Sequence, residues 1–149
     1  MFCHDQEFLY VAASVPRAEH VSTGGVQLGG REHDADLSLF DRLSIAIDVD
    51  RDYATWYTLE VDQRGWTSEQ CWDDKGWDPK WYVAADADEK HWRIEAAIPM
   101  AELVPESPNP GVTWAVGIVR TMPAVGVQGW PEASGSKPRP EAFGLIRLE

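Results

Sequence analysis

The sequence predicts an all-β fold: an antiparallel β-sandwich of two sheets, with a jelly-roll or immunoglobulin-like architecture. Three observations predict it. Polar and apolar residues alternate in several short runs, clusters of Gly, Pro and Asp separate these runs, and no run has the length and period of a useful amphipathic helix. With 149 residues, 44% of them hydrophobic, the chain is expected to fold as a single domain over residues 1–149.

Each expected strand rests on alternation or on an apolar run between turn residues. The clearest pair is 43–49 and 57–61, with the polar residues around Asp50-Arg51-Asp52 as the hairpin loop between them. The run 92–98 ends at Pro99, which cannot donate to a central ladder. The remaining strands are expected at 8–15, 81–85, 114–119 and 143–148, and one helical turn at 100–103.

Eight tryptophans are far more than a chain of this length ordinarily carries. Trp92 and Trp114 are in phase with the apolar side of their strands, so both are assigned to the core. A second group lies among acidic residues in a polar stretch, a mixture of ring faces and polar edges that suits saccharide binding. This group is Trp66, Trp72, Trp77 and Trp81. The alternative is that these rings cover an open face of the sandwich.

The formal net charge of −12 argues against nucleic acid and against an anionic membrane as partners, because both are bound mainly through Lys and Arg. No stretch reaches the apolar length that spans a bilayer, and the first residues lack the basic start and apolar run of a signal peptide.

Asp48, Asp50 and Asp52 repeat every second residue and place hard oxygen donors close together, as a calcium site requires. An EF-hand is excluded because Tyr53 stands at the glycine position of that loop and Val61 at the position of the bidentate glutamate. A simpler calcium site and a solvated hairpin loop both remain as interpretations. No other cofactor is required by the sequence.

Two cysteines, Cys3 and Cys71, are too few for a disulfide framework and are not spaced as a metal site. A single bridge and two unpaired thiols are the alternatives. No pair of carboxylates is placed by the sequence as the acid and nucleophile of glycoside hydrolysis, so a non-catalytic role is expected.

The order of signature residues along the chain resembles the family-9 carbohydrate-binding modules and their DOMON-like relatives. The resemblance extends over nearly the whole chain from Glu7 onward. Its pieces are Asp41 to Asp48, Tyr57 to Gly65, Trp92-Arg93-Ile94-Glu95-Ala96-Ala97-Ile98-Pro99, Glu102-Leu103, Trp114 to Arg120, Trp130, and Phe143-Gly144-Leu145.

The resemblance implies a module that binds a polysaccharide or oligosaccharide, accessory to a carbohydrate-active or extracellular protein, in a secreted or periplasmic setting. Sugar-binding members stack the ligand between two Trp; here the first falls near Ser38, a sugar-contacting Glu falls near Ser44, and only the late Trp, Trp130, is kept. Weak or altered glycan binding is therefore expected.

Family members have strands upstream of the one that matches Leu9-Tyr10-Val11, so the resemblance also implies an N-terminally short sandwich. The strand at 8–15 would then lie at or near an open edge, which favours a homodimer through that edge.

Two alternatives differ in class. DOMON-like relatives can hold haem b through axial Met with His or Lys, and Met100, Met122 and His91 are the candidate ligands here. The other alternative is a purely structural interaction domain that keeps the sandwich and binds no ligand.

Overall fold

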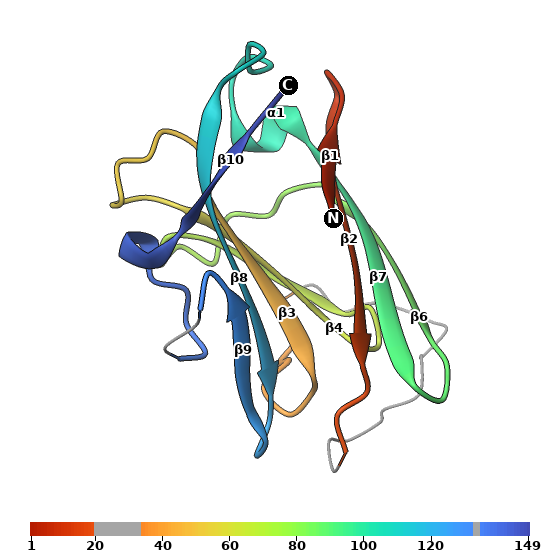
Figure 1. The fold of residues 1–149 in the computed structure, drawn as a ribbon. Helices are drawn as coiled ribbons and strands as arrows, with labels where there is room; N and C mark the ends of the chain where they lie inside the picture. The colour runs from red at the N-terminus through yellow and green to blue at the C-terminus, as the bar shows by residue number, and fades with distance from the viewer. Residues whose placement is uncertain (20–33, 133–134) are drawn as a thin grey trace.

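The computed structural model describes residues 1–19, 34–132 and 135–149, which form two antiparallel sheets packed face to face (Figure 1). The four-stranded sheet has the order β1-β2-β7-β6. These strands are β1 (Phe2–His4), β2 (Phe8–Pro16), β7 (His91–Pro99) and β6 (Tyr82–Ala87). The predicted all-β sandwich is confirmed.

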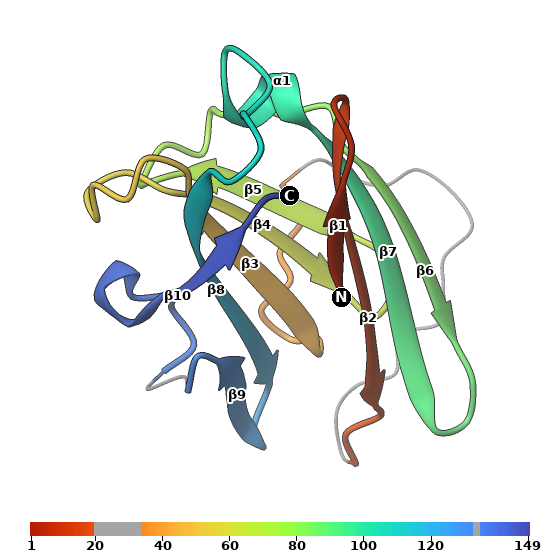
Figure 2. The same cartoon turned by 45° about the horizontal axis from the view of Figure 1, so that its top comes forward.

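The six-stranded sheet has the order β10-β8-β3-β4-β5, with β9 paired to the far end of β8 (Figure 2). Its strands are β3 (Arg42–Asp48), β4 (Tyr57–Asp62), β5 (Thr67–Cys71), β8 (Thr113–Met122), β9 (Gly126–Trp130) and β10 (Gly144–Arg147). The predicted helical turn is confirmed as α1 (Met100–Leu103), and a short 3-10 turn, η1 (Pro140–Ala142), precedes β10.

Three strands were not predicted from the sequence, each for a physical reason. β1 has three residues, β5 reads Thr-Ser-Glu-Gln-Cys without apolar alternation, and β9 contains two glycines and is exposed throughout. One short strand, β1, lies upstream of the strand that begins at Phe8 and pairs with it. β2 lies next to the edge of its sheet, as predicted, and β1 covers only part of it.

The core lies between the inward faces of the two sheets, where the alternating apolar residues meet. Leu9 and Ile98 of one sheet pack with Ile45 and Leu59 of the other. Trp92 and Trp114 are fully buried, so their assignment to the core is confirmed.

A buried ion pair connects the sheets. Asp41, just before β3, accepts hydrogen bonds from Arg120 of β8 through Nε (2.9 Å) and a terminal nitrogen (2.5 Å). The same carboxylate accepts the indole N–H of Trp92 in the other sheet at 2.9 Å, and Arg120 also donates to the Pro16 carbonyl of β2 at 2.5 Å. Both charged groups therefore have hydrogen-bond partners in both sheets. Buried charges are stable only when they are paired in this way.

A second polar link has the same form. Glu69 in β5 points into the sandwich opposite Leu59 and is 1% exposed. The indole N–H of Trp81, which directly precedes β6, donates to its carboxylate. In both links a tryptophan of the four-stranded sheet donates to a carboxylate of the six-stranded sheet.

The two cysteines do not form a bridge. Cys3 lies on β1 and Cys71 on β5, in different sheets, and both are free thiols. Burial raises the pKa of the Cys71 thiol.

In the part of the chain that the structure describes, no helix is long and apolar enough to cross a bilayer.

Arg120→Met is expected to lower the free energy of unfolding by about 3–5 kcal/mol, because it leaves the Asp41 carboxylate buried with the Trp92 indole as its remaining partner. Chemical denaturation measures this loss. The matched control, Asp86→Asn, removes one partner of the exposed Arg93 and should leave stability within error. The double variant Asp41→Leu/Arg120→Met should recover part of the loss, and no recovery would contradict the assignment of the cost to an unpaired charge.

Candidate functional site

The tryptophans that are neighbours in the sequence are divided between the two ends of β5. Trp66 precedes β5, whereas Trp72 follows it and leads into the stretch that holds Trp77 and Trp81. Six residues of extended chain separate Trp66 from Trp72, about 20 Å at roughly 3.3 Å per residue. The predicted group of four rings therefore does not form one site.

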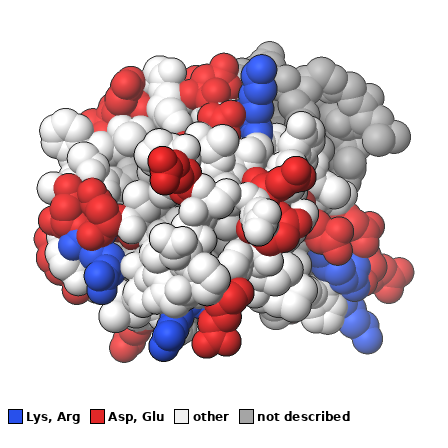
Figure 3. Space-filling model, turned by 90° about the horizontal axis from the view of Figure 1, so that it is seen from above, with Lys and Arg blue, Asp and Glu red and all other residues white. Residues whose placement is uncertain are grey.

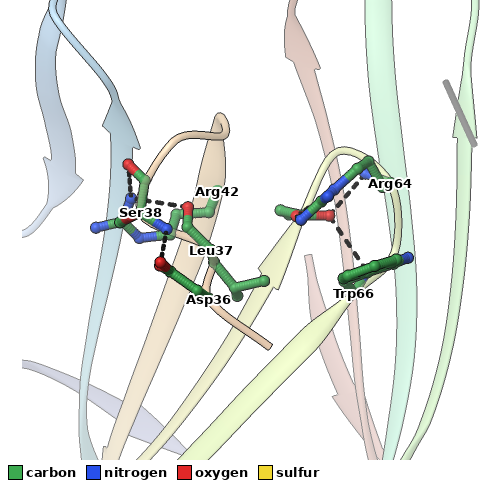
Figure 4. Close-up of polar contacts among 7 residues, drawn as sticks. Asp36, Leu37, Ser38, Arg42, Arg64 and Trp66 are labelled. Carbon is green, nitrogen blue, oxygen red and sulfur yellow. Dashed lines mark hydrogen bonds and ion pairs between the residues drawn. The ribbon is translucent and has the colours of Figure 1, made fainter. Parts of the chain in front are cut away.

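Trp66 takes part in a stack with Arg64 in the β4–β5 turn (Figure 4). The central guanidinium carbon of Arg64 lies 4.2 Å from the Trp66 ring centroid and 3.3 Å from that of Phe40. Asp62 holds the turn: it accepts the backbone N–H groups of Arg64 (2.8 Å) and Trp66 (3.2 Å) and pairs with the guanidinium at 2.6 Å. The cation covers part of the Trp66 ring, and Phe40 is held in the same stack.

The position expected for a first sandwiching Trp, Ser38, lies in a loop fixed by polar contacts (Figure 4). Its backbone N–H donates to Asp36 at 2.9 Å, which lowers the pKa of that carboxyl. Arg42 donates to the carbonyl groups of Leu37 (3.3 Å) and Ser38 (3.5 Å). A serine hydroxyl at this position supplies no ring on which a sugar could stack.

Ser44, the position at which the resemblance places a sugar-contacting Glu of the family, lies beside a glutamate of the neighbouring strand. Ser44 pairs with Glu60 in the β3–β4 register, and its hydroxyl donates to the Glu60 carboxylate. Arg42 Nε lies 3.7 Å from the same carboxylate. Sequence reasoning missed Glu60 because only the strand register reveals it.

Of the three tryptophans beyond β5, two pack against the core. Trp81 uses its indole N–H on Glu69 and packs against both apolar clusters, and Trp77 packs on Tyr57 with ring centroids 4.7 Å apart. Trp72 is 52% exposed and lies in a turn with a positive φ of 55°. Trp72 is therefore the exposed member of the three.

Trp130 ends β9 and forms a one-sided platform. The indole is 48% exposed, and one side of it packs on Gly144, where a Cβ would lie 2.5 Å from the ring. The register explains this contact, because β9 and β10 meet on the same edge of β8: Trp130 is opposite Ile118 and Gly144 is opposite Val116.

The platform has a polar border. A depression of about 20 Å³ beside Trp130 is lined by Glu132, Lys137 and Arg139, with Phe143 and Pro131 as its apolar wall. A ring face bordered by a carboxylate and two cations presents the donors and acceptors that fix saccharide hydroxyls.

The stack of Phe40, Arg64 and Trp66 does not supply a second ring opposite Trp130. Arg64 is held by Asp62 at the end of β4, and β4 lies three strand spacings from β9, about 14 Å. Two rings on opposite faces of one sugar lie about 7–8 Å apart, since each contact spans about 3.5–4.0 Å.

Comparison of the structure with solved structures returns carbohydrate-binding modules. A family-9 module from Caldicellulosiruptor kristjanssonii in complex with glucose has a TM-score of 0.61 at 14% identity, covering 99% of this chain and 74% of that chain. The same kind of module with cellotriose has a TM-score of 0.62 at 15% identity, covering 99% and 72%. A putative carbohydrate-binding protein from Bacteroides uniformis has a TM-score of 0.71 at 14% identity, covering 99% and 76%.

This chain has a CBM9-like fold. No family model and no curated protein matches the sequence, so the likeness lies in the structure and in the order of signature residues. Three of those residues, Asp41, Trp92 and Arg120, are the ones that meet in the buried link between the sheets.

The CBM9-like sandwich does not bring the haem candidates together. Met100 is 2% exposed and packs in the core directly after β7, whereas His91 is the first residue of that strand, which spans about 26 Å. Met122 lies at the end of β8 in the other sheet, and His91 alternates with the buried Trp92 and so faces outward. An axial Met–His pair is not formed by these residues.

The loop after β3 brings three carboxylates together. One oxygen of each of Asp48, Asp50 and Asp52 lies within 4.8 Å of the others. Asp48 accepts the backbone N–H groups of Arg51 (2.6 Å) and Tyr53 (3.0 Å), both of which have positive φ. Burial raises the pKa of Asp48, with a further rise from Asp50 that the two backbone hydrogen bonds oppose.

Asp50→Asn is expected to raise the melting temperature at neutral pH by about 1–3 °C, because it removes a like charge beside Asp48. The sign follows from the raised pKa: ionised Asp48 destabilises the fold as pH rises through that pKa. The gain should vanish below the ordinary carboxyl pKa of 3.8, where Asp48 is neutral in both folded and unfolded chains.

Calcium tests the metal interpretation of the same loop. Thermal melts with millimolar calcium should stabilise the wild-type chain more than Asp50→Asn if the three carboxylates bind the ion. Equal shifts in both proteins would leave the solvated hairpin as the interpretation.

Proposed function

We propose that this chain is a non-catalytic glycan-binding module, and that the exposed face of Trp130 is its saccharide contact. The observation that carries the proposal is the half-exposed indole whose back packs on Gly144. A ring supported from behind keeps its orientation, so little conformational entropy is lost when a sugar stacks on it. The neighbours named above as family-9 modules with glucose and cellotriose support a saccharide as the class of ligand.

The binding is weak, because a sugar contacts one ring here and not two. A second aromatic contact would contribute about 0.5–1.5 kcal/mol beyond its buried area. Since each 1.4 kcal/mol changes affinity about tenfold, millimolar dissociation constants are expected. Glu132, Lys137 and Arg139 supply the hydrogen bonds around the ring.

The absence of catalysis is part of the proposal. Among the described residues that line the depression beside Trp130, Glu132 is the single carboxylate. Glycoside hydrolysis uses two carboxyl groups, about 5–10 Å apart, on either side of the scissile bond. The module would serve as an accessory to a carbohydrate-active or extracellular protein in a secreted or periplasmic setting, with calcium at Asp48, Asp50 and Asp52 as an optional ion.

The edge of β2 offers a contact for a second copy. Ala12 exchanges backbone hydrogen bonds with Met1, so even-numbered residues of β2 direct their backbone groups toward β1. Ser14 lies beyond the end of β1, and its N–H and C=O point to an edge that no strand among residues 1–19, 34–132 and 135–149 covers, while Pro16 has no N–H to expose there. We propose an antiparallel edge-to-edge homodimer through Ser14.

Titration calorimetry with cello- and xylo-oligosaccharides should show millimolar binding that Trp130→Ala abolishes without loss of fold. Gly144→Ala is the matched variant, because its methyl group displaces the ring from its support and should also weaken binding. Leu145→Ala, at an exposed neighbour, should bind as the wild type does. Retained binding in Trp130→Ala would exclude this ring, and no binding by the wild type would favour a purely structural domain.

Sedimentation equilibrium should show a dimer at high protein concentration, and Ser14→Pro should shift it to the monomer. Proline removes the open-edge N–H and leaves the β2–β7 ladder intact. Ser14→Ala keeps the N–H and should keep the dimer. A wild-type chain that stays monomeric would overturn the proposed dimer.

A further inference from the structure

The outer face of the four-stranded sheet carries a groove that lies on the opposite sheet from Trp130. It has a volume of about 420 Å³, within the range of small-molecule sites. Its walls are Tyr10 on β2 and Tyr82 on β6. Its floor is formed by small residues of β2, β6 and the central strand β7. The floor residues are Ala12, Ala84 and Ala97. We call this site the tyrosine groove.

The strand register fixes the width of the tyrosine groove. Tyr10 and Tyr82 are both opposite Ala97 on the central strand β7, so their backbones lie two strand spacings apart, about 10 Å. One flat ring with an aromatic contact on each side needs about 7–8 Å between the two aromatic faces. With the methyl group of Ala97 as the floor, the two tyrosine backbones are far enough apart for one saccharide ring to lie between the side chains.

Phe8 and Asp5 hold the tyrosine walls in place. Phe8 packs against both, with ring centroids 5.8 Å from Tyr10 and 6.2 Å from Tyr82, and so closes one end of the slot. The Tyr10 hydroxyl donates to Asp5 at 3.0 Å, which raises the pKa of Tyr10 and fixes its ring. Tyr82 is 64% exposed and offers both its face and its hydroxyl.

A carboxylate stands at the other end of the slot. Glu95 occupies the next outward position of β7 and lies between Ala12 and Ala84, whose side chains are too short to cover it. Glu95 is exposed and pairs with no cation among residues 1–19, 34–132 and 135–149. The nearest arginine along β7, Arg93, is bound to Asp86 at 3.0 Å and to Asp88.

The charge around the groove favours a cation. Asp5 and Glu7 lie on the side of Tyr10, and Asp86 on the side of β6, while the amino group of Met1 is bound to the Ala12 carbonyl at 2.8 Å. The chain carries a net charge of −12, and Figure 3 shows acidic side chains spread over one face with basic ones scattered among them. Such a field attracts cationic ligands.

We propose that the tyrosine groove binds an amino sugar, with its pyranose ring between Tyr10 and Tyr82 and its protonated amino group on the Glu95 carboxylate. The C–H face of the ring contacts the aromatic faces, and the ammonium forms a charge-assisted hydrogen bond with a carboxylate that pairs with no cation among the described residues. A second copy of the chain would bring two acidic faces together, and an anionic membrane would be repelled. The site is independent of the Trp130 platform.

The test compares a glucosamine dimer, with its amines protonated, with the N-acetylglucosamine dimer and cellobiose as neutral probes of the same size. Calorimetry should show binding of the glucosamine dimer at least tenfold tighter than either neutral probe and weakened by salt. Backbone amide NMR shifts should map to Ala84, Ala97 and their neighbours. Glu95→Gln should weaken binding about tenfold, the loss of one charge-assisted hydrogen bond.

The controls separate this site from the platform. Tyr82→Ala should abolish binding of the glucosamine dimer, whereas Tyr82→Phe keeps the ring and should retain most of it. Trp130→Ala should leave the affinity for the glucosamine dimer unchanged, whether or not Trp130 binds neutral glycans. Equal affinity for the neutral probes, shifts confined to β9, no binding of the glucosamine dimer, or binding of phenethylamine alone would each overturn the proposal.

Discussion

The buried carboxylate of Asp41 is the constraint on which the two-sheet arrangement depends. It is fully buried and satisfied by three hydrogen bonds, two from Arg120 in its own sheet and one from Trp92 in the other. Arg120 in turn reaches the Pro16 carbonyl across the interface. An unpaired charge here would be costly. The hydrogen bonds of Asp41 therefore fix the lateral position of one sheet relative to the other as well as the distance between the sheets. Apolar contacts alone are less selective, since they tolerate small shifts between layers.

Fixing the sheets through their inner faces leaves the outer face of the four-stranded sheet available for binding. β7 shows this division within one strand: Trp92 and Ile94 face the core, while Arg93, Glu95 and Ala97 face outward. The same alternation on β3 turns Ile45 inward and Ser44 to the outer side of its sheet, where Ser44 is buried and bonds to Glu60. The tyrosine groove is therefore made by residues whose strand neighbours belong to the core, and this support gives the surface its rigidity.

The sequence predicted the parts of the fold that depend on period-two patterns, and it failed where strand pairing decides. The strands around Leu59, Ile94 and Trp114 followed from alternation, but β5 did not, because its inward residue is Glu69. The proximity of Trp66, Trp72, Trp77 and Trp81 in the sequence suggested one site, yet β5 separates the first from the rest. Glu60 and the Tyr10–Ala97–Tyr82 row could not be found from the sequence, because both arise from cross-strand register.

The environment of the indole N–H identifies two tryptophans of this chain as structural. Trp92 and Trp81 each donate to a buried carboxylate, and breaking such a bond would leave that carboxylate short of a partner. Trp92 is therefore fixed in the interior, and the partly buried Trp81 is held against the core. Trp130 is half exposed, and its ring is held by contact with Gly144. Water can solvate its exposed edge before a ligand arrives, so a sugar can replace that water without breaking a buried bond. Composition alone showed eight tryptophans as equivalent, and hydrogen bonding together with burial separates Trp81 and Trp92 from Trp130.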